Sequence, residues 1–98
     1  MVQHIVMWKL KDELSAEEKE IAKKTMKEKL EALVGVVPGL QKLTVSFNYK
    51  EGFYDLCLVS LHDDKAALDV YANHPAHCKV KEYVHSVVSD RTFCDSEI

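Results

Sequence analysis

The sequence lacks the features that mark several common classes of function. None of its segments approaches the roughly 20 consecutive apolar residues of a membrane-spanning helix. The first residues, "MVQHIVMWKLKDE", contain neither the basic leader nor the long apolar run of a secretory signal. The net charge is -3, and the lysines of "EEKEIAKKTMKEK" alternate with glutamates instead of forming a basic stripe. We therefore expect neither a membrane nor a nucleic acid as a partner.

Signals for metals, bound phosphates and disulfides are also missing. The three cysteines are an odd number without a C-x-x-C pair, which indicates free thiols in a reducing compartment. The three glycines are scattered, so no glycine-rich loop is available to hold phosphates. No H-E-x-x-H motif is present, and Pro75 separates His74 and His77 from any continuous helix. The sequence thus predicts a cytoplasmic protein without a metal or another cofactor.

What is present is a set of periodic patterns that predicts one α+β domain spanning residues 1–98. The expected elements, in chain order, are a strand at residues 2–10, a helix that starts after Ser15, strands at residues 40–49 and 53–61, a helix capped by Asp63 or Asp64, a helix that starts at Pro75, and a strand at residues 88–94. This order is that of the ferredoxin-like βαββαβ fold with a four-stranded antiparallel sheet.

Local signals set the ends of these elements. Ser15 and Glu18 have the spacing of a capping box, and Gly35 is suited to follow the end of the helix that they start. The motif "YANHPAH" predicts a helix break within residues 73–75, because proline cannot donate a helical hydrogen bond and the residue before it avoids the helical conformation. We expect His74 to cap the next helix, and Gly52 to adopt a positive φ in a short hairpin loop.

The predicted sheet is apolar on both faces. In the first strand, Ile5 and Met7 lie opposite the face that carries Val6 and Trp8, and the third strand is likewise apolar on both sides. Helices from one chain cover only one face, so the second face needs another cover. We therefore expect a homodimer packed sheet to sheet, a dimeric α/β barrel with a largely enclosed space between the two sheets.

Three segments carry a resemblance to a known family. "VQHIVMWKLK", "VPGLQKLTVSFN" and "YDLCLVSLHDDKAALDVYANHPAH" resemble the stress-responsive A/B barrel domain family over nearly the whole chain, with "YANHPAH" as the most specific part. The resemblance implies a dimeric α/β barrel of ferredoxin-like subunits. A plant branch of polyketide cyclases, similar to olivetolic acid cyclase, closes a ring by aldol condensation without a cofactor or metal. Dimeric monooxygenases of antibiotic biosynthesis share the architecture without the HPAH signature.

The resemblance also implies candidate site residues. The active-site tyrosine of the cyclases falls on Tyr71, the catalytic histidine on His77 and a further pocket histidine on His4. Another pocket histidine falls on Asp55, so this chain departs from the cyclase pattern there. We expect Trp8 to lie in the core or in the wall of the same pocket.

Each candidate also has a purely structural interpretation. His77 falls in the first turn of its helix, where the helix dipole disfavours imidazolium and keeps a general base neutral, but its side chain can equally bond to the backbone across the turn. His4 lies among apolar residues, as many core histidines do. Asp55 either pairs with a pocket histidine or sits at an exposed strand end.

Two functions follow from these observations. In the first, the protein is a dimeric stress-responsive A/B barrel domain that binds a small apolar or aromatic molecule in the pocket. In the second, it is a cofactor-independent enzyme, similar to the cyclases or the monooxygenases, in which Tyr71 and His77 act as acid and base. Asp55 favours the first function, whereas Tyr71, His77 and His4 favour the second.

Overall fold

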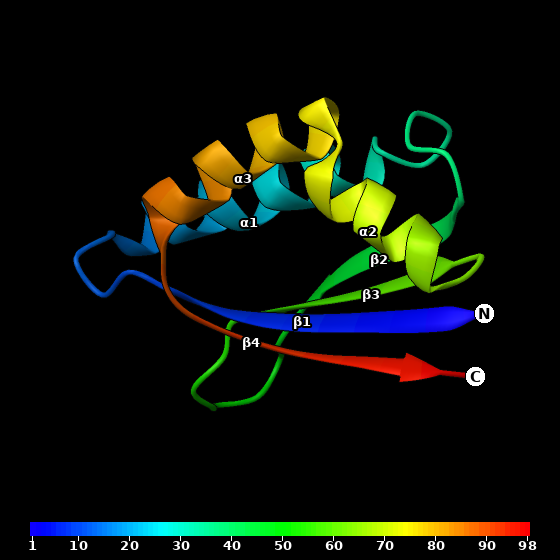
Figure 1. Ribbon diagram of the computed structural model, residues 1–98. Coiled ribbons are helices and arrows are strands. Elements are labelled where there is room, and N and C mark those ends of the chain that lie inside the picture. Colours follow the sequence, from blue (N-terminus) through cyan, green and yellow to red (C-terminus); the bar gives the residue numbers. More distant parts are fainter.

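One antiparallel sheet with three helices on one of its faces makes up the chain (Figure 1). This computed structural model describes residues 1–98. The elements are β1 (Val2–Leu10), α1 (Ala16–Glu31), β2 (Leu40–Phe47), β3 (Leu56–His62), α2 (Lys65–Asn73), α3 (Pro75–Val87) and β4 (Val88–Glu97). The strand order is β2-β3-β1-β4, with each neighbouring pair antiparallel. The predicted ferredoxin-like fold is confirmed.

The core lies between the sheet and the helices, as the alternation in the strands predicts. In β1 the residues at even positions are buried under the helices, whereas Ile5 and Met7 face the other way. The helices contribute fully buried side chains such as Met26 and Leu30 of α1 and Tyr71 of α2. Burial of this apolar surface is the main force that holds the two layers together.

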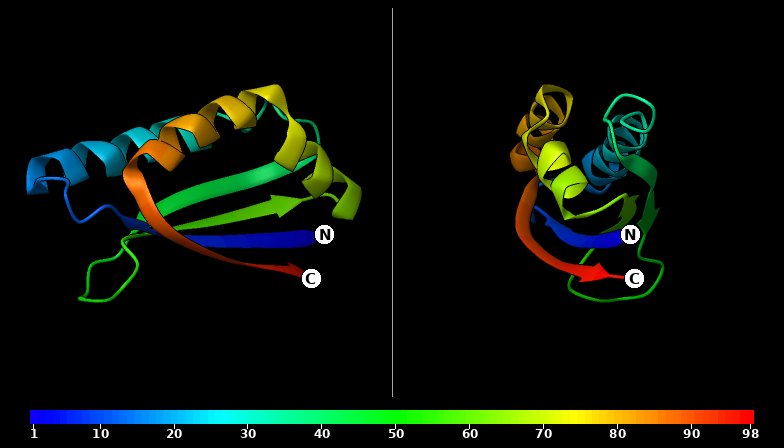
Figure 2. Two further views of the ribbon diagram at one scale, coloured as in Figure 1. Left: turned by 60° about the vertical axis from the view of Figure 1, so that its left-hand side comes forward. Right: turned by 45° about the vertical axis from the view of Figure 1, so that its right-hand side comes forward.

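The face of the sheet opposite the helices has no cover in the chain (Figure 2). Its centre is apolar and consists of half-buried side chains and one exposed side chain from β1 and β3, namely Ile5, Met7, Cys57, Val59 and Leu61. We call these five residues the open-face patch. The prediction that the sheet has two apolar faces is therefore confirmed.

Capping side chains begin the helices where the sequence predicts. The hydroxyl of Ser15 accepts a hydrogen bond of 3.1 Å from the Glu18 backbone N–H, and the Glu18 carboxylate accepts one of 2.9 Å from the Ser15 N–H. The break between α2 and α3 falls at His74, whose Nδ1 accepts a hydrogen bond of 3.1 Å from the Ala76 N–H. Pro75 opens α3, as expected for a residue without an N–H.

The hairpin and its glycines differ from the prediction. The loop covers residues 48–55, so β2 ends two residues earlier and β3 begins three residues later than expected. Only Gly35 and Gly39 have a positive φ, and the prediction for Gly52 is wrong because the longer loop spreads the turn over more residues. Gly39 is needed for a second reason: a β-carbon there would lie 2.6 Å from the Ala67 β-carbon.

Candidate functional site

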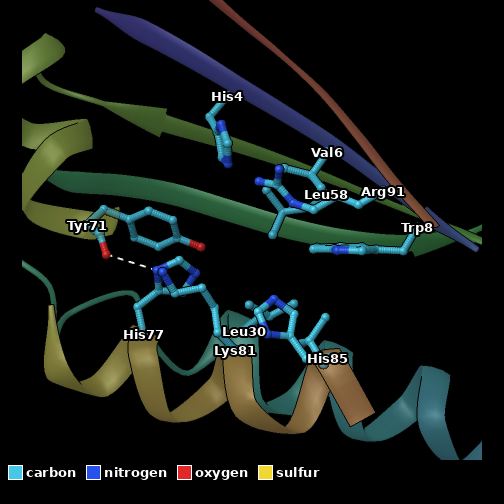
Figure 3. Close-up of a pocket in the computed structure, with 11 residues that line it drawn as sticks. His4, Val6, Trp8, Leu30, Leu58, Tyr71, His77, Lys81, His85 and Arg91 are labelled. Carbon is cyan, nitrogen blue, oxygen red and sulfur yellow. Dashed lines mark hydrogen bonds between the residues drawn. The ribbon is translucent and has the colours of Figure 1, made fainter. Parts of the chain in front are cut away.

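A cavity of about 300 Å³ lies between the sheet and the helices (Figure 3). Residues from β1, α1, β3, α2, α3 and β4 line it: His4, Val6, Trp8, Leu30, Leu58, Tyr71, His77, Lys81, Val84, His85 and Arg91. This cavity is separate from the enclosed space that the sequence predicts between the two sheets of a dimer, because it lies on the helix side of the sheet. Strand β1 turns its even-numbered residues, His4 and Trp8 among them, toward the helices.

Tyr71 forms one end of the cavity from the end of α2. Its side chain is buried, and its ring stacks on the His77 ring with centroids 4.0 Å apart and an interplanar angle of 24°. The hydroxyl group points into the cavity (Figure 3). Burial raises the pKa of Tyr71 above its ordinary value, against the opposing charge of Arg91. The phenol therefore stays protonated at neutral pH and can donate a hydrogen bond to a bound molecule.

His77 is fixed in one orientation by the backbone. Its Nδ1 lies 3.0 Å from the carbonyl oxygen of Tyr71, and a carbonyl accepts, so Nδ1 carries the proton and Nε2 keeps a free lone pair. Burial, with the charge of Lys81, lowers the pKa of His77 to about 4. The sequence predicts the direction of this shift but assigns it to the helix dipole, whereas burial is the larger cause.

His4 faces Tyr71 from the sheet, with ring centroids 6.1 Å apart. Its Nδ1 contacts the carboxylate of Asp95, which lies directly opposite it on β4. A carboxylate accepts, so Nδ1 of His4 carries a proton in this contact. Sequence reasoning did not find Asp95, because the predicted final strand stopped at Cys94, one residue short of it.

His62 is a further buried histidine that sequence reasoning missed. Its Nε2 lies 2.9 Å from the hydroxyl oxygen of Ser60, while its Nδ1 is the one buried side-chain polar atom in the chain without a hydrogen-bond partner. The ring packs edge-on against both His4 and Tyr71. Burial lowers the pKa of His62. The alternation of β3 places Leu58, Ser60 and His62 on the helix side, and a strand prediction extended by one residue would have included His62.

The structure brings four of the five predicted site residues together and leaves one out. His4, Trp8, Tyr71 and His77 all line the cavity, and Trp8 forms part of its apolar wall. Asp55 lies elsewhere: its carboxylate accepts a hydrogen bond of 2.8 Å from the Leu10 N–H, and its own N–H donates to the Trp8 carbonyl at 2.8 Å. Asp55 thus joins the end of β1 to the hairpin loop, which is a structural role.

No group of three or more histidine, cysteine, aspartate or glutamate side chains in the chain is arranged to hold a metal ion. None of the three helices is long and apolar enough to cross a membrane.

Comparison with known proteins identifies the family. The model of the stress responsive A/B barrel domain matches residues 2–98. The chain belongs to this family. No similar sequence was found among curated proteins.

Solved structures of similar proteins share the whole fold. A dimeric protein of unknown function from Bacteroides fragilis is 31% identical, with a TM-score of 0.93 over 99% of this chain and 95% of that one. A dimeric protein of unknown function from Thermobifida fusca is 18% identical, with a TM-score of 0.83 over 99% and 90% of the two chains. A hydroxynitrile lyase from Passiflora edulis is 13% identical, with a TM-score of 0.81 over 99% and 92%. At such identities the last two show that these proteins share the fold.

Proposed function

We propose that this member of the family is a homodimer in which the open-face patch packs against the same patch of a second copy. An apolar, uncovered sheet face supports this proposal, because a soluble protein rarely leaves such a surface in water. The dimeric state of the similar protein from Bacteroides fragilis supports it as well. Sedimentation equilibrium should give twice the mass of the 11.2 kDa chain. The mass of a single chain would contradict the proposal.

Each copy, in the same proposal, binds a small apolar or aromatic molecule in the cavity described above. The observation that carries this is the lining of the cavity, which combines an apolar wall of Trp8 and aliphatic side chains with polar groups. The Tyr71 hydroxyl and the His77 and His4 imidazoles lie at one end, and the remaining polar side chains of the lining are Lys81, His85 and Arg91. Ligand sites commonly combine an apolar wall with a few fixed polar groups. The volume of about 300 Å³ is at the low end of such sites, which favours a compact ligand.

The protonation states of the polar groups favour binding over acid–base catalysis. A general acid or base works best when its pKa lies near the pH at which it acts. The pKa of Tyr71 is raised above its ordinary value and that of His77 is lowered to about 4, so each is far from that range at neutral pH. A protonated phenol and a neutral imidazole in fixed positions are instead a donor and an acceptor for a bound molecule.

Fluorescence of Trp8 tests the binding proposal directly, since it is the single tryptophan of the chain and lies in the cavity wall. We expect a set of one-ring aromatic molecules to change its emission in a saturable way. The variant Tyr71→Phe keeps the ring and removes the hydroxyl, so it should fold and should weaken ligands that bond to that hydroxyl. No saturable change with any member of the set would contradict the proposal.

A cofactor-independent enzyme is the second candidate, and the His4–Asp95 pair favours it. An imidazole held by a carboxylate, close to a phenol that can stabilise an oxyanion, is suited to remove a proton next to a carbonyl group. Exchange of such a proton in a one-ring 1,3-diketone, followed by NMR in D₂O, provides the test. We expect His4→Gln to abolish any acceleration. Exchange at the rate of buffer alone would exclude this activity for that class of compound.

A further inference from the structure

Two positively charged side chains meet at the cavity from opposite walls. Arg91, the only arginine of the chain, comes from β4, and Lys81 comes from α3 (Figure 3). None of the residues that line the cavity is acidic. In a chain whose net charge is -3, a cavity that carries only positive formal charge is an unexpected local excess.

Neither cation has a carboxylate partner in the chain. The five ion pairs of the structure involve other residues. The Lys81 ammonium donates one hydrogen bond of 3.0 Å to the Ala72 carbonyl, which leaves two of its three donors free. The Arg91 guanidinium lies 4.9 Å from the centroid of the Phe93 ring, a contact that steadies its plane without using its N–H groups.

Two carboxylates lie near these cations, and neither forms an ion pair with Lys81 or Arg91. Asp69 and Asp95 border a smaller hollow next to the cavity, to which Lys81 and Arg91 also belong. Asp95 is engaged by His4, and Asp69 is an exposed residue of α2 without an ion pair. Each cation affects the pKa of a group at the polar end of the cavity. Arg91 opposes the rise in the pKa of Tyr71, and Lys81 contributes to the lowering of the pKa of His77.

We propose that the ligand of the cavity is a small aromatic or apolar carboxylic acid, whose carboxylate is held by Arg91 and Lys81 and whose apolar body lies against Trp8. This inference rests on the function proposed above and names the chemical class of the ligand. A carboxylate fits because its two oxygens match the guanidinium fork, while the lysine supplies a second positive charge. The Tyr71 hydroxyl then donates to a polar substituent or to the carboxylate itself.

Pairs of ligands that differ only in charge test the proposal. Benzoate with benzamide, and phenylacetate with phenylacetamide, have nearly the same shape in each pair, and Trp8 fluorescence reports their binding. We expect each acid to bind about tenfold more tightly than its amide, the effect of one charge-assisted contact. Arg91→Gln and Lys81→Gln should each remove most of this preference for the acid over its amide. Added salt should reduce the preference as well.

A matched control separates a local contact from a general effect of charge. Lys79 is exposed on the same helix and does not line the cavity, so Lys79→Gln changes the net charge by the same amount and should leave the preference intact. Far-UV circular dichroism of all variants checks that they fold. Phenyl phosphate, as a third type of probe, should bind no more tightly than benzoate.

The outcomes distinguish this inference from the function on which it rests. Saturable binding of acids and amides with equal affinity would overturn the carboxylate proposal and leave the proposed function standing. Tighter binding of phenyl phosphate than of benzoate would overturn the choice of carboxylate among anions. An absence of saturable binding for every probe would overturn both proposals.

Discussion

The protonation of His77 links the stability of the fold to the chemistry of the cavity. Burial lowers the pKa of His77 from 6.5 to about 4. The folded state therefore disfavours the proton that the unfolded chain accepts near pH 6.5. Stability that depends on a neutral His77 is fully present above about pH 6.5 and is lost as the pH falls toward about 4.

The size of this effect follows from the shift. Each pKa unit corresponds to about 1.4 kcal/mol of the free energy of unfolding, and water partly screens a half-buried imidazole. The free energy of unfolding that is lost when His77 becomes protonated is therefore about 2–3 kcal/mol. In the variant His77→Gln the side chain can still donate to the Tyr71 carbonyl but does not titrate. His62, whose pKa is also lowered, is present in both proteins, and its contribution cancels in the difference between them.

Urea denaturation at a fixed protein concentration provides the measurement. Between about pH 7.5 and about pH 4, the free energy of unfolding of the wild type should fall by about 2–3 kcal/mol more than that of His77→Gln. NMR titration of the His77 ring should show a pKa well below 6.5, and an anionic ligand in the cavity should raise it. Parallel pH profiles for the two proteins, with a His77 pKa close to 6.5, would refute the reasoning.

Three further substitutions test the core, the turn and the open face. Met26→Ala removes a side chain that is fully buried in α1 and should cost about 2–5 kcal/mol in urea denaturation, whereas Ile21→Ala, at a site 57% exposed on the same helix, should cost far less. Gly39→Ala should destabilise the fold by more than Gly35→Ala. Both glycines have a positive φ, at which a β-carbon costs about 1–2 kcal/mol, but only at Gly39 would the β-carbon also collide with Ala67. Equal losses of stability in the two variants would contradict the collision with Ala67. Met7→Glu places a charge in the open-face patch and should shift sedimentation equilibrium toward the single chain, and an unchanged mass would place the dimer contact elsewhere.

The fold could be predicted from the sequence because its signals are local. The alternation of β1, the capping box at Ser15 and the proline after His74 each act within a few residues, and the structure confirms all three. The prediction of a positive φ for Gly52 was wrong, because the sequence of a longer loop does not determine at which residue the chain turns. Loop conformation depends on contacts such as the one between the Asn48 side chain and the Tyr54 carbonyl, which spacing does not reveal.

The site was predictable only in part, since it depends on how distant strands align. Tyr71 and His77 are joined by a short segment, so their proximity follows from the helix break. The pairing of His4 with Asp95 depends on the register of β1 and β4, which lie at opposite ends of the chain. Arg91 lines the cavity for the same reason. Such registers follow from the packing of the whole sheet and are weakly encoded in any single segment.

The central claim is that the cavity beneath the helices is the ligand site of this protein. A crystal structure of the protein soaked with its tightest-binding one-ring carboxylic acid tests that claim most directly. We expect density for the ring against Trp8, next to Tyr71 and His77, with the carboxylate at Arg91. An empty cavity, with the ligand bound instead on the open-face patch or between two copies of the sheet, would contradict it.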